Sequence, residues 1–366
     1  MRKRSRVGGM NLREKILKVL RSYSPEKIKI ATLGSHSALN ILRGARDEGF
    51  ETICLCKSDD AIVYRNFGVA DRIVELNDFG DLLNKEVQEF LRRENAILIP
   101  HGSFNAYIGK FDDLEIPIFG NRKLMEYETK REKQREWFLK AGVKIPREFK
   151  NPEEIEGLCI VKFQGARGGR GYFLVTSAED FREKAKKIVE RGLAREEDLS
   201  KAEIQEYVIG ANVYFSFFYS AVNDRVELIS IDRRYEHVDG IGRIPAHEQL
   251  KLDFKPTYTV IGNFPLVLRE SLLKQAFDVA ERLVNASKEI AYPGMVGPFC
   301  VESVFNERAE LIVFEISARI VAGTNAGVPS SLYSYVLFGE NMYMGRRIAR
   351  EIKLAIEKDM LGEVIY

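Results

Sequence analysis

The chain has 366 residues, of which 45% are apolar and 30% are charged, a composition typical of globular proteins and not of disordered ones. A single hydrophobic core rarely exceeds about 250–300 residues, so this length allows two or three packed units. The formal net charge is only +2, which gives no reason to expect a nucleic-acid partner.

The cysteines and the N-terminus indicate the compartment. Cys54 and Cys56 would share one face of a strand, and buried core thiols are favoured over a metal site because no C-x-x-C pair with nearby histidines is present. No apolar run reaches the ~18 residues of a membrane span. The basic segment from Met1 to Met10 has no apolar stretch behind it, so we expect a disordered tail or a translation start at Met10 instead of a secretory signal. We therefore predict a cytoplasmic protein with no membrane partner.

After an N-terminal tail and helix (1–24), residues 25–120 alternate strand and helix patterns, which is typical of a parallel sheet with helices on its faces. Ligands of such sheets bind beyond the carboxyl ends of the strands. Two loops stand there, Gly34–Ser37 and His101–Phe104. The expected strands are 27–33, 51–56, 72–75 and 96–100, and the expected helices are 12–21, one ending at Arg46, and 82–92.

Two further units follow, a small α+β unit that resembles a lid (121–212) and a larger C-terminal unit (213–366). The charged segment 123–140 is predicted to be helical and to end at Gly142, before Pro146. The other lid elements are strands at 158–163, 172–176 and about 204–208, and a helix at 178–191. The C-terminal unit is expected to contain strands at 214–221 and 226–231, helices at 266–286 and 344–357, and a hairpin at 299–315.

A glycine-rich loop between the first two lid strands is the strongest local signal. Its glycines allow the backbone N–H groups to approach a phosphate chain closely, while Lys162 adds a point charge and Arg167 or Arg170 a planar fork. No Gly-Lys-Ser/Thr follows, so it is not a Walker loop. The alternative is a flexible hairpin turn with exposed arginines. The glycines are Gly165, Gly168, Gly169 and Gly171.

Two acidic residues are expected to face each other in the C-terminal hairpin. Folding residues 299–316 about the junction of Arg308 and Ala309 places Glu302 opposite Glu315 on one face. Two adjacent carboxylates repel, and Mg²⁺ bound to ATP oxygens is a natural ion to bridge them. Arg319 follows and could neutralise a transferring phosphoryl group. The alternative is a solvated hairpin face, and a slip of one residue would separate the two acids.

In combination these motifs resemble the ATP-grasp ligases: a nucleotide-fold domain, then the lid from Lys162, the hinge Glu206–Val208, and Glu302 with Glu315–Arg319. The resemblance implies an ATP-grasp fold preceded by a parallel-sheet domain, in the α/β and α+β classes. More narrowly, five strings resemble the archaeal formate-dependent 5-formaminoimidazole-4-carboxamide ribonucleotide synthetases of purine biosynthesis. They are Thr32–Ser37, Pro100–Phe104, Val161–Gly171, Tyr292–Phe299 and Gly345–Lys353.

The resemblance implies a reaction in which ATP, formate and 5-aminoimidazole-4-carboxamide ribonucleotide (AICAR) give the formylated nucleotide, ADP and phosphate through formyl phosphate. Mg²⁺ or Mn²⁺ would be bound by Glu302 and Glu315, with Arg319 as the catalytic residue. The implied ATP ligands are Lys162, Gly165, Arg167, Gly168, Gly169, Glu206, Tyr207, Val208 and Glu236. The implied ribonucleotide ligands are His36, Ser103 and Asn263. The family also implies a homo-oligomer, a trimer or a hexamer.

Several alternatives stay open at this stage. His36 could cap a helix, and Ser103 and Asn263 are also common turn residues. Ser317 stands where many ATP-grasp enzymes have asparagine. The chain could instead be a related ligase that joins another acid to another amine, or a nucleotide-binding regulator without catalysis. An oxidoreductase is disfavoured because Gly34–Ser37 lacks the G-x-G-x-x-G pattern.

Overall fold

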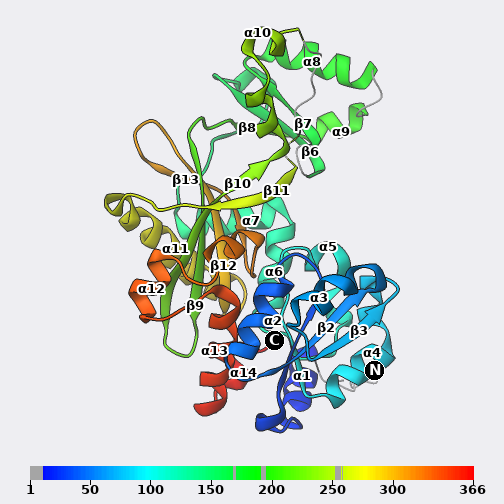
Figure 1. Cartoon of the computed structure of the whole chain (residues 1–366). Coiled ribbons are helices and arrows are strands. Elements are labelled where there is room, and N and C mark those ends of the chain that lie inside the picture. Colours follow the sequence, from blue (N-terminus) through cyan, green and yellow to red (C-terminus); the bar gives the residue numbers. More distant parts are fainter. Residues whose placement is uncertain (1–10, 168–169, 191–194, 252–256, 258) are drawn as a thin grey trace, which may run out of the picture.

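The computed structural model describes residues 11–167, 170–190, 195–251, 257 and 259–366. Its strands form three sheets, which Figure 1 shows one above another. A four-stranded parallel sheet lies at the bottom, a five-stranded antiparallel sheet in the middle, and a four-stranded antiparallel sheet at the top. This mixed α/β and α+β architecture is the one the sequence predicts.

The parallel sheet has the strand order β3-β2-β1-β4. The chain therefore changes direction across the sheet between β1 and β4, and the loops after these two neighbouring strands meet at the switch point where such sheets bind ligands. The four expected strands are confirmed within two residues at each end, the expected helix at 82–92 begins at Lys85, and the helices at Ala61–Phe67 and Phe104–Ile108 were not predicted. The elements are β1 (Lys29–Leu33), α2 (Ala38–Asp47), β2 (Glu51–Lys57), α3 (Ala61–Phe67), β3 (Arg72–Leu76), α4 (Lys85–Arg93) and β4 (Ala96–Leu98).

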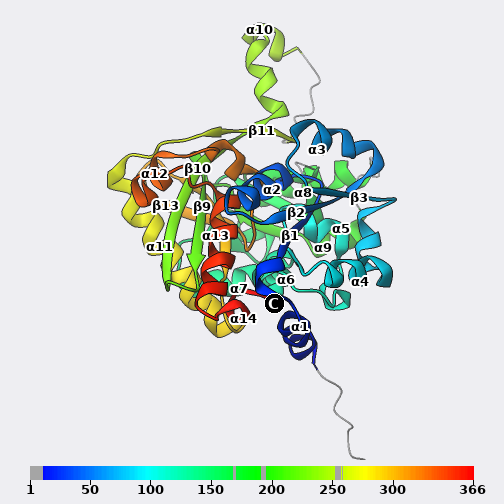
Figure 2. The same ribbon diagram turned by 60° about the horizontal axis from the view of Figure 1, so that its bottom comes forward.

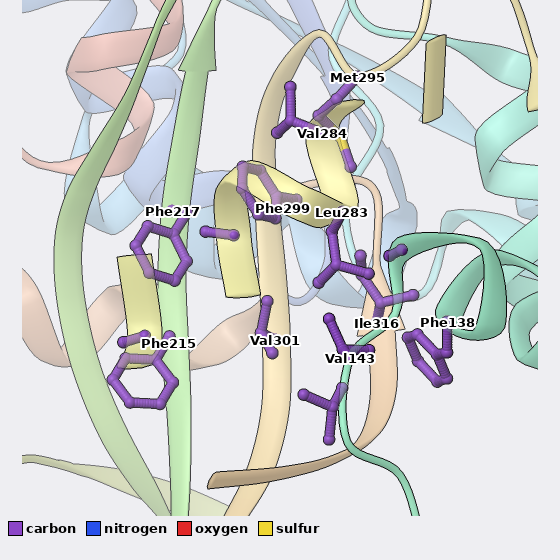
Figure 3. Close-up of a cluster of buried hydrophobic side chains, with 14 of the residues drawn as sticks. Phe138, Val143, Phe215, Phe217, Leu283, Val284, Met295, Phe299, Val301 and Ile316 are labelled. Carbon is purple, nitrogen blue, oxygen red and sulfur yellow. The ribbon is translucent and has the colours of Figure 1, made fainter. Parts of the chain in front are cut away.

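The five-stranded sheet has the order β11-β10-β9-β12-β13 and two contrasting faces. Phe215, Phe217, Phe299 and Val301 point from one face into a buried apolar core against helices α7 and α11, as Figure 3 shows. Alternate residues point to the opposite face, which carries polar groups. The elements are β9 (Ala211–Ser220), β10 (Arg225–Glu236), β11 (Val260–Pro265), α11 (Glu270–Ile290), β12 (Gly297–Phe305) and β13 (Leu311–Ser317).

The segment expected to be one helix over 123–140 is two helices, because Lys130 between them has an extended backbone. Both pack on the five-stranded sheet, and Trp137 is fully buried there, with its indole N–H donating to the carbonyl of Leu283 at 2.9 Å. The proposed boundary at residue 121 would assign these helices to the lid, although their side chains belong to the core of the middle sheet. The helices are α6 (Arg122–Thr129) and α7 (Arg131–Ala141).

The top sheet has the order β5-β8-β6-β7 and is covered by α8. The hairpin of β6 and β7 carries the glycine-rich segment, as the sequence predicts. Figure 2 shows α10 projecting away from the rest of the molecule. The elements are β5 (Glu148–Phe149), β6 (Cys159–Arg167), β7 (Arg170–Val175), α8 (Ala178–Glu190), α9 (Glu196–Ser200), β8 (Glu203–Glu206) and α10 (Ala246–Gln249).

Helix α13 (Met344–Glu357) joins the parallel sheet to the middle sheet. Its Gly345 lies directly against α2, where the backbone N–H donates to the Asn40 side chain at 2.7 Å. On the other side Arg347 forms a buried ion pair with Glu227 of β10 at 2.6 Å. These contacts fix the loops of the parallel sheet over the polar face of the middle sheet. The remaining helices are α1 (Leu12–Arg21), α5 (Phe104–Ile108), α12 (Leu332–Phe338) and α14 (Leu361–Val364).

The cysteines and the helices bear on the expected compartment. All four cysteines are free and buried, as predicted. Among the residues that the structure describes, no helix has the length and apolar character needed to cross a membrane.

Candidate active site

The polar face of the middle sheet carries a row of four paired residues, one from each of four adjacent strands. Asp232 pairs with Tyr214, Tyr214 with Glu302, and Glu302 with Glu315. Directly paired residues point to the same face with Cβ atoms about 4.5–5.5 Å apart. We call these four residues the carboxylate row. The predicted pairing of Glu302 with Glu315 is thereby confirmed, and the register shifts only beyond it, after Glu302.

The two facing carboxylates differ in their surroundings. Glu302 is buried, whereas Glu315 is exposed. Arg234 of β10 reaches across and pairs with one oxygen of Glu302, and its guanidinium lies 4.5 Å from the centre of the Tyr214 ring. The other oxygen of Glu302 has no hydrogen-bond partner. Burial, and then repulsion from Glu315, raises the pKa of Glu302 although Arg234 opposes the shift.

This arrangement fits a divalent cation held between carboxylates and phosphate oxygens. A buried carboxylate oxygen without a partner is costly, and a cation would satisfy it and relieve the repulsion. No cluster of three or more His, Cys, Asp or Glu side chains suited to a metal occurs among the described residues. The protein would therefore supply two carboxylates and leave the other positions to nucleotide and water, which is how Mg²⁺ is commonly bound.

Arg319 lies just beyond β13, where the middle sheet meets the parallel sheet. The next residue, Ile320, forms a bridge with His101 in the loop after β4. Arg319 pairs with the buried Glu128 of α6 at 2.8 Å and contributes to the electrostatic environment of His36. The structure thus brings the predicted catalytic arginine close to a predicted substrate ligand.

The loops after β1 and β4 meet at the switch point, as expected. The rings of His36 and His101 stack with centroids 5.5 Å apart, and Gly102 leaves room for them, since an added Cβ would lie 2.2 Å from Nε2 of His36. His101 is fully buried, donates from Nε2 to the Leu33 carbonyl at 3.1 Å and accepts the Ser103 N–H at 3.3 Å. His101 therefore supports both predicted ligands, His36 and Ser103.

The two histidines are held neutral to different degrees. Burial lowers the pKa of His101 to about 3. More than a third of His36 is exposed, and the burial of the rest of its ring, followed by the charge of Arg319, lowers its pKa. His36 also adopts a left-handed backbone with φ of 53°, and its Nδ1 lies 2.7 Å from the Ser37 hydroxyl. A helix N-cap is not its role, because Ser37 occupies that position of α2.

Asn263 lies in the edge strand β11 and not in the turn that its sequence allows. Its amide donates to Asp232 in the carboxylate row at 2.8 Å. Burial raises the pKa of Asp232 to about 6. Asn263 is therefore at the polar face, at the opposite edge from Glu315.

The described members of the predicted ATP site come from the top sheet, from the segment after β8 and from the end of β10 in the middle sheet. Lys162 of β6 donates to Gln205 at 2.7 Å, and burial, followed by Arg131, lowers its pKa. Glu206 ends β8 and accepts the backbone N–H of Arg147 at 3.1 Å, and Tyr207 and Val208 follow it. Glu236 is half-buried at the end of β10. Gly165 and Arg167 are in β6, and Gly168 and Gly169 lie outside the described residues.

The sequence analysis missed four residues of this region. Asp232 and Arg234 alternate at the end of an apolar strand, a period-two signal that could have placed them on the polar face. His101 lies in the recognised motif Pro100–Phe104, but the sequence does not show that its side chain is buried. Glu128 gave no signal, because it lies in a charged helical segment where every acidic residue looks solvated.

Comparisons with known proteins identify the family. A family model described as "Protein of unknown function (DUF1246)" matches residues 30–149, and "Domain of unknown function (DUF1297)" matches 180–366. The chain is 64% identical over 97% of its length to the 5-formaminoimidazole-4-carboxamide-1-(beta)-D-ribofuranosyl 5'-monophosphate synthetase of Archaeoglobus fulgidus, of which 99% is covered. The chain belongs to this synthetase family. The synthetase of Methanocaldococcus jannaschii is 46% identical, with 96% of this chain and 99% of the relative covered.

Solved structures support the same assignment and give the fold. The crystal structure of an IMP biosynthesis protein PurP from Thermococcus kodakaraensis has a TM-score of 0.73 and 31% identity, covering 92% of this chain and all of that one. A biotin carboxylase from Campylobacter jejuni in complex with an ATP analogue has a TM-score of 0.62 at 14% identity, covering 90% and 71% of the two chains. The synthetase family member described here therefore has the ATP-grasp fold and is an ATP-dependent ligase.

Proposed function

We propose that the protein formylates AICAR with formate and ATP, releasing ADP and phosphate, in purine nucleotide synthesis. The observation that carries the proposal is the convergence at one place of the Glu302–Glu315 pair, Arg319 and the loops bearing His36 and Ser103. The sequence relatives named as synthetases of the formylated ribonucleotide support the choice of substrate.

The reaction would proceed in two steps that need no protein nucleophile. The formate carboxylate would attack the γ-phosphorus of ATP, giving formyl phosphate and ADP. The amine of AICAR would then attack the formyl carbon, phosphate would leave, and the nitrogen would lose its proton. The protein is left with positioning and charge neutralisation.

The chain's own residues would divide this work by location. Lys162, the β6–β7 segment and Glu236 would hold the nucleotide between the middle and top sheets. Glu302 and Glu315 would hold Mg²⁺ or Mn²⁺, which would neutralise charge on phosphate oxygens. His36 and Ser103 at the switch point, with Asn263 across the polar face, would orient the ribonucleotide.

We also propose a homo-oligomer, trimeric or hexameric, in the cytoplasm. The support is a set of exposed apolar side chains on helix α12 and on the edge strand β11. On helix α12, Tyr335 is 57% and Val336 76% exposed, and on β11 Ile261 is 67% exposed. Exposed apolar surface of this kind is usually covered in an assembly. Light scattering should show a smaller particle for Val336→Glu, and an unchanged mass would remove this surface from the interface.

The proposed reaction can be tested directly. Phosphate release from ATP and Mg²⁺ is measured with formate alone, with AICAR alone and with both, together with the absorbance of the formylated product. Phosphate release that needs both substrates, with product formation, is the expected result. Nucleotide binding with no turnover would favour a regulator, and turnover with another acid or amine would favour a related ligase.

A further inference from the structure

Glu128 of helix α6 lies at the meeting point of three parts of the structure. Its side chain is 4% exposed, forms one ion pair and accepts two hydrogen bonds. The ion pair is with the Arg319 guanidinium at 2.8 Å, and the hydrogen bonds come from the Asn105 amide of α5 at 2.5 Å and from the Ala318 backbone N–H at 2.6 Å. One carboxylate therefore holds the segment after β13 to a helix of the parallel-sheet unit.

The way in which Glu128 holds Arg319 leaves part of the guanidinium available. Nη2 of Arg319 lies 2.8 Å from the carboxylate, and Nε is buried without a hydrogen-bond partner among the residues that the structure describes. Arg319 is 12% exposed. A buried N–H group without a partner is costly, and it is normally satisfied by a ligand or by water. The guanidinium is thus a planar donor, fixed at one end, whose Nε edge remains for an anion.

The surroundings indicate which kind of anion would use this edge. The carboxylate row begins at Glu315, four residues before Arg319, and the electrostatic influence of Glu315 extends to Glu128. His36 lies on the other side, close enough for Arg319 to lower its pKa. The free edge therefore lies between the predicted metal site and the predicted ribonucleotide site, where a phosphoryl group would pass.

We propose that Glu128 is a positioning residue that fixes Arg319 with its Nε edge toward the transferring phosphoryl group. The inference rests on the proposed function, because it assigns Arg319 to phosphoryl transfer. Glu128 does not touch the reacting atoms and acts only through Arg319. A guanidinium that is fixed before reaction needs no reorganisation when charge develops, which is the condition for effective electrostatic stabilisation.

A purely structural role would have different consequences. If Glu128 only joined α6 to the segment after β13, its replacement would lower stability and would affect every kinetic constant alike. If it positions Arg319, its replacement should lower kcat with little change in the KM for ATP, and the effect should vanish once Arg319 is gone. These expectations can be separated by a double-mutant cycle.

The cycle compares Glu128→Gln, Arg319→Ala and the double variant, with Glu126→Gln as the matched control. Glu126 is on the same helix and pairs with Lys130 and Lys133 at the surface. Glu128→Gln should lower kcat by roughly 10- to 100-fold, and the double variant should be no slower than Arg319→Ala. Additive losses, or normal turnover in Glu128→Gln, would overturn the inference while the proposed function stands.

A second measurement, of nucleotide affinity, does not depend on turnover. Calorimetry compares the affinities of a non-hydrolysable ATP analogue and of ADP, each with Mg²⁺, for the full-length protein. Arg319→Ala and Glu128→Gln should both reduce the preference for the triphosphate, and Glu128→Asp should restore part of it. If the wild type shows no formate- and AICAR-dependent turnover, the proposed function fails. An unchanged preference for the triphosphate in Glu128→Gln would independently refute the role of Glu128.

Discussion

Removal of Glu315 should have opposite effects on stability with and without nucleotide. Glu315 faces Glu302 directly across the β12–β13 pair, and like charges in that position destabilise a sheet by about 0.2–1 kcal/mol. Because Glu315 is exposed, Glu315→Ala removes no core volume. The free energy of unfolding of the ligand-free variant should therefore equal that of the wild type or exceed it by up to about 1 kcal/mol.

The sign reverses when ATP and Mg²⁺ are added. A ligand at about 100 times its Kd stabilises the native state by about 2.7 kcal/mol. The variant lacks one of two proposed metal carboxylates, so it should lose most of this gain. Turnover should fall by at least about 100-fold, the loss that follows removal of one strong electrostatic stabiliser.

The assay is thermal unfolding of wild type and Glu315→Ala, each alone, with Mg²⁺, and with Mg²⁺ and ATP, followed by phosphate release. Glu307→Ala is the control, because that exposed residue lies in the same hairpin turn and pairs with Arg308 at the surface. A variant with normal turnover, or with the full stabilisation by ATP and Mg²⁺, would refute the assignment of Glu315 to the metal. A marked loss of stability without ligand would refute the argument from repulsion.

Four further predictions concern the loops and the contact between the sheets. His36→Ala should raise the KM for AICAR with little effect on the KM for ATP, and unchanged AICAR kinetics would remove His36 from the site. Gly102→Ala should also raise the KM for AICAR, because the added Cβ would lie 2.2 Å from Nε2 of His36. Steady-state kinetics measures this change. The pKa of His101 is about 3 when folded and about 6.5 when unfolded, so only the unfolded state takes up a proton between these values. The free energy of unfolding should therefore decrease as the pH is lowered through that window, by up to about 1.4 kcal/mol per pH unit. Denaturant unfolding at several pH values should show a weaker pH dependence for His101→Gln. Arg347→Met removes the buried cation that pairs with both Glu227 and Glu351 and leaves Glu227 with the half-exposed Arg225, so it should cost about 3 kcal/mol. Glu227→Gln in the same chain should recover a part, and a loss below about 1 kcal/mol would contradict this reasoning.

Local sequence patterns were sufficient to predict most helices and strands and the pairing of Glu302 with Glu315. The alternation of strand and helix before residue 120 predicted the parallel sheet, and helix α13 has the predicted bounds, 344–357. The pairing of Glu302 with Glu315 could be predicted because a short hairpin restricts the register of its two strands. The edge strand β11 was missed, since its residues include Gly262 and Pro265 and its pairing partner is far away in the sequence.

The sequence by itself determined the types of residue available for phosphate, metal and substrate, because those depend on short motifs and on strand periodicity. Only the tertiary structure decided which of them meet. Arg234 reaches Glu302 across β9, and Glu128 reaches Arg319 from a helix 191 positions earlier in the chain, a spacing that no local pattern encodes. Burial is also a property of the packed chain, and it is burial that lowers the pKa of His101 and raises the pKa of Glu302.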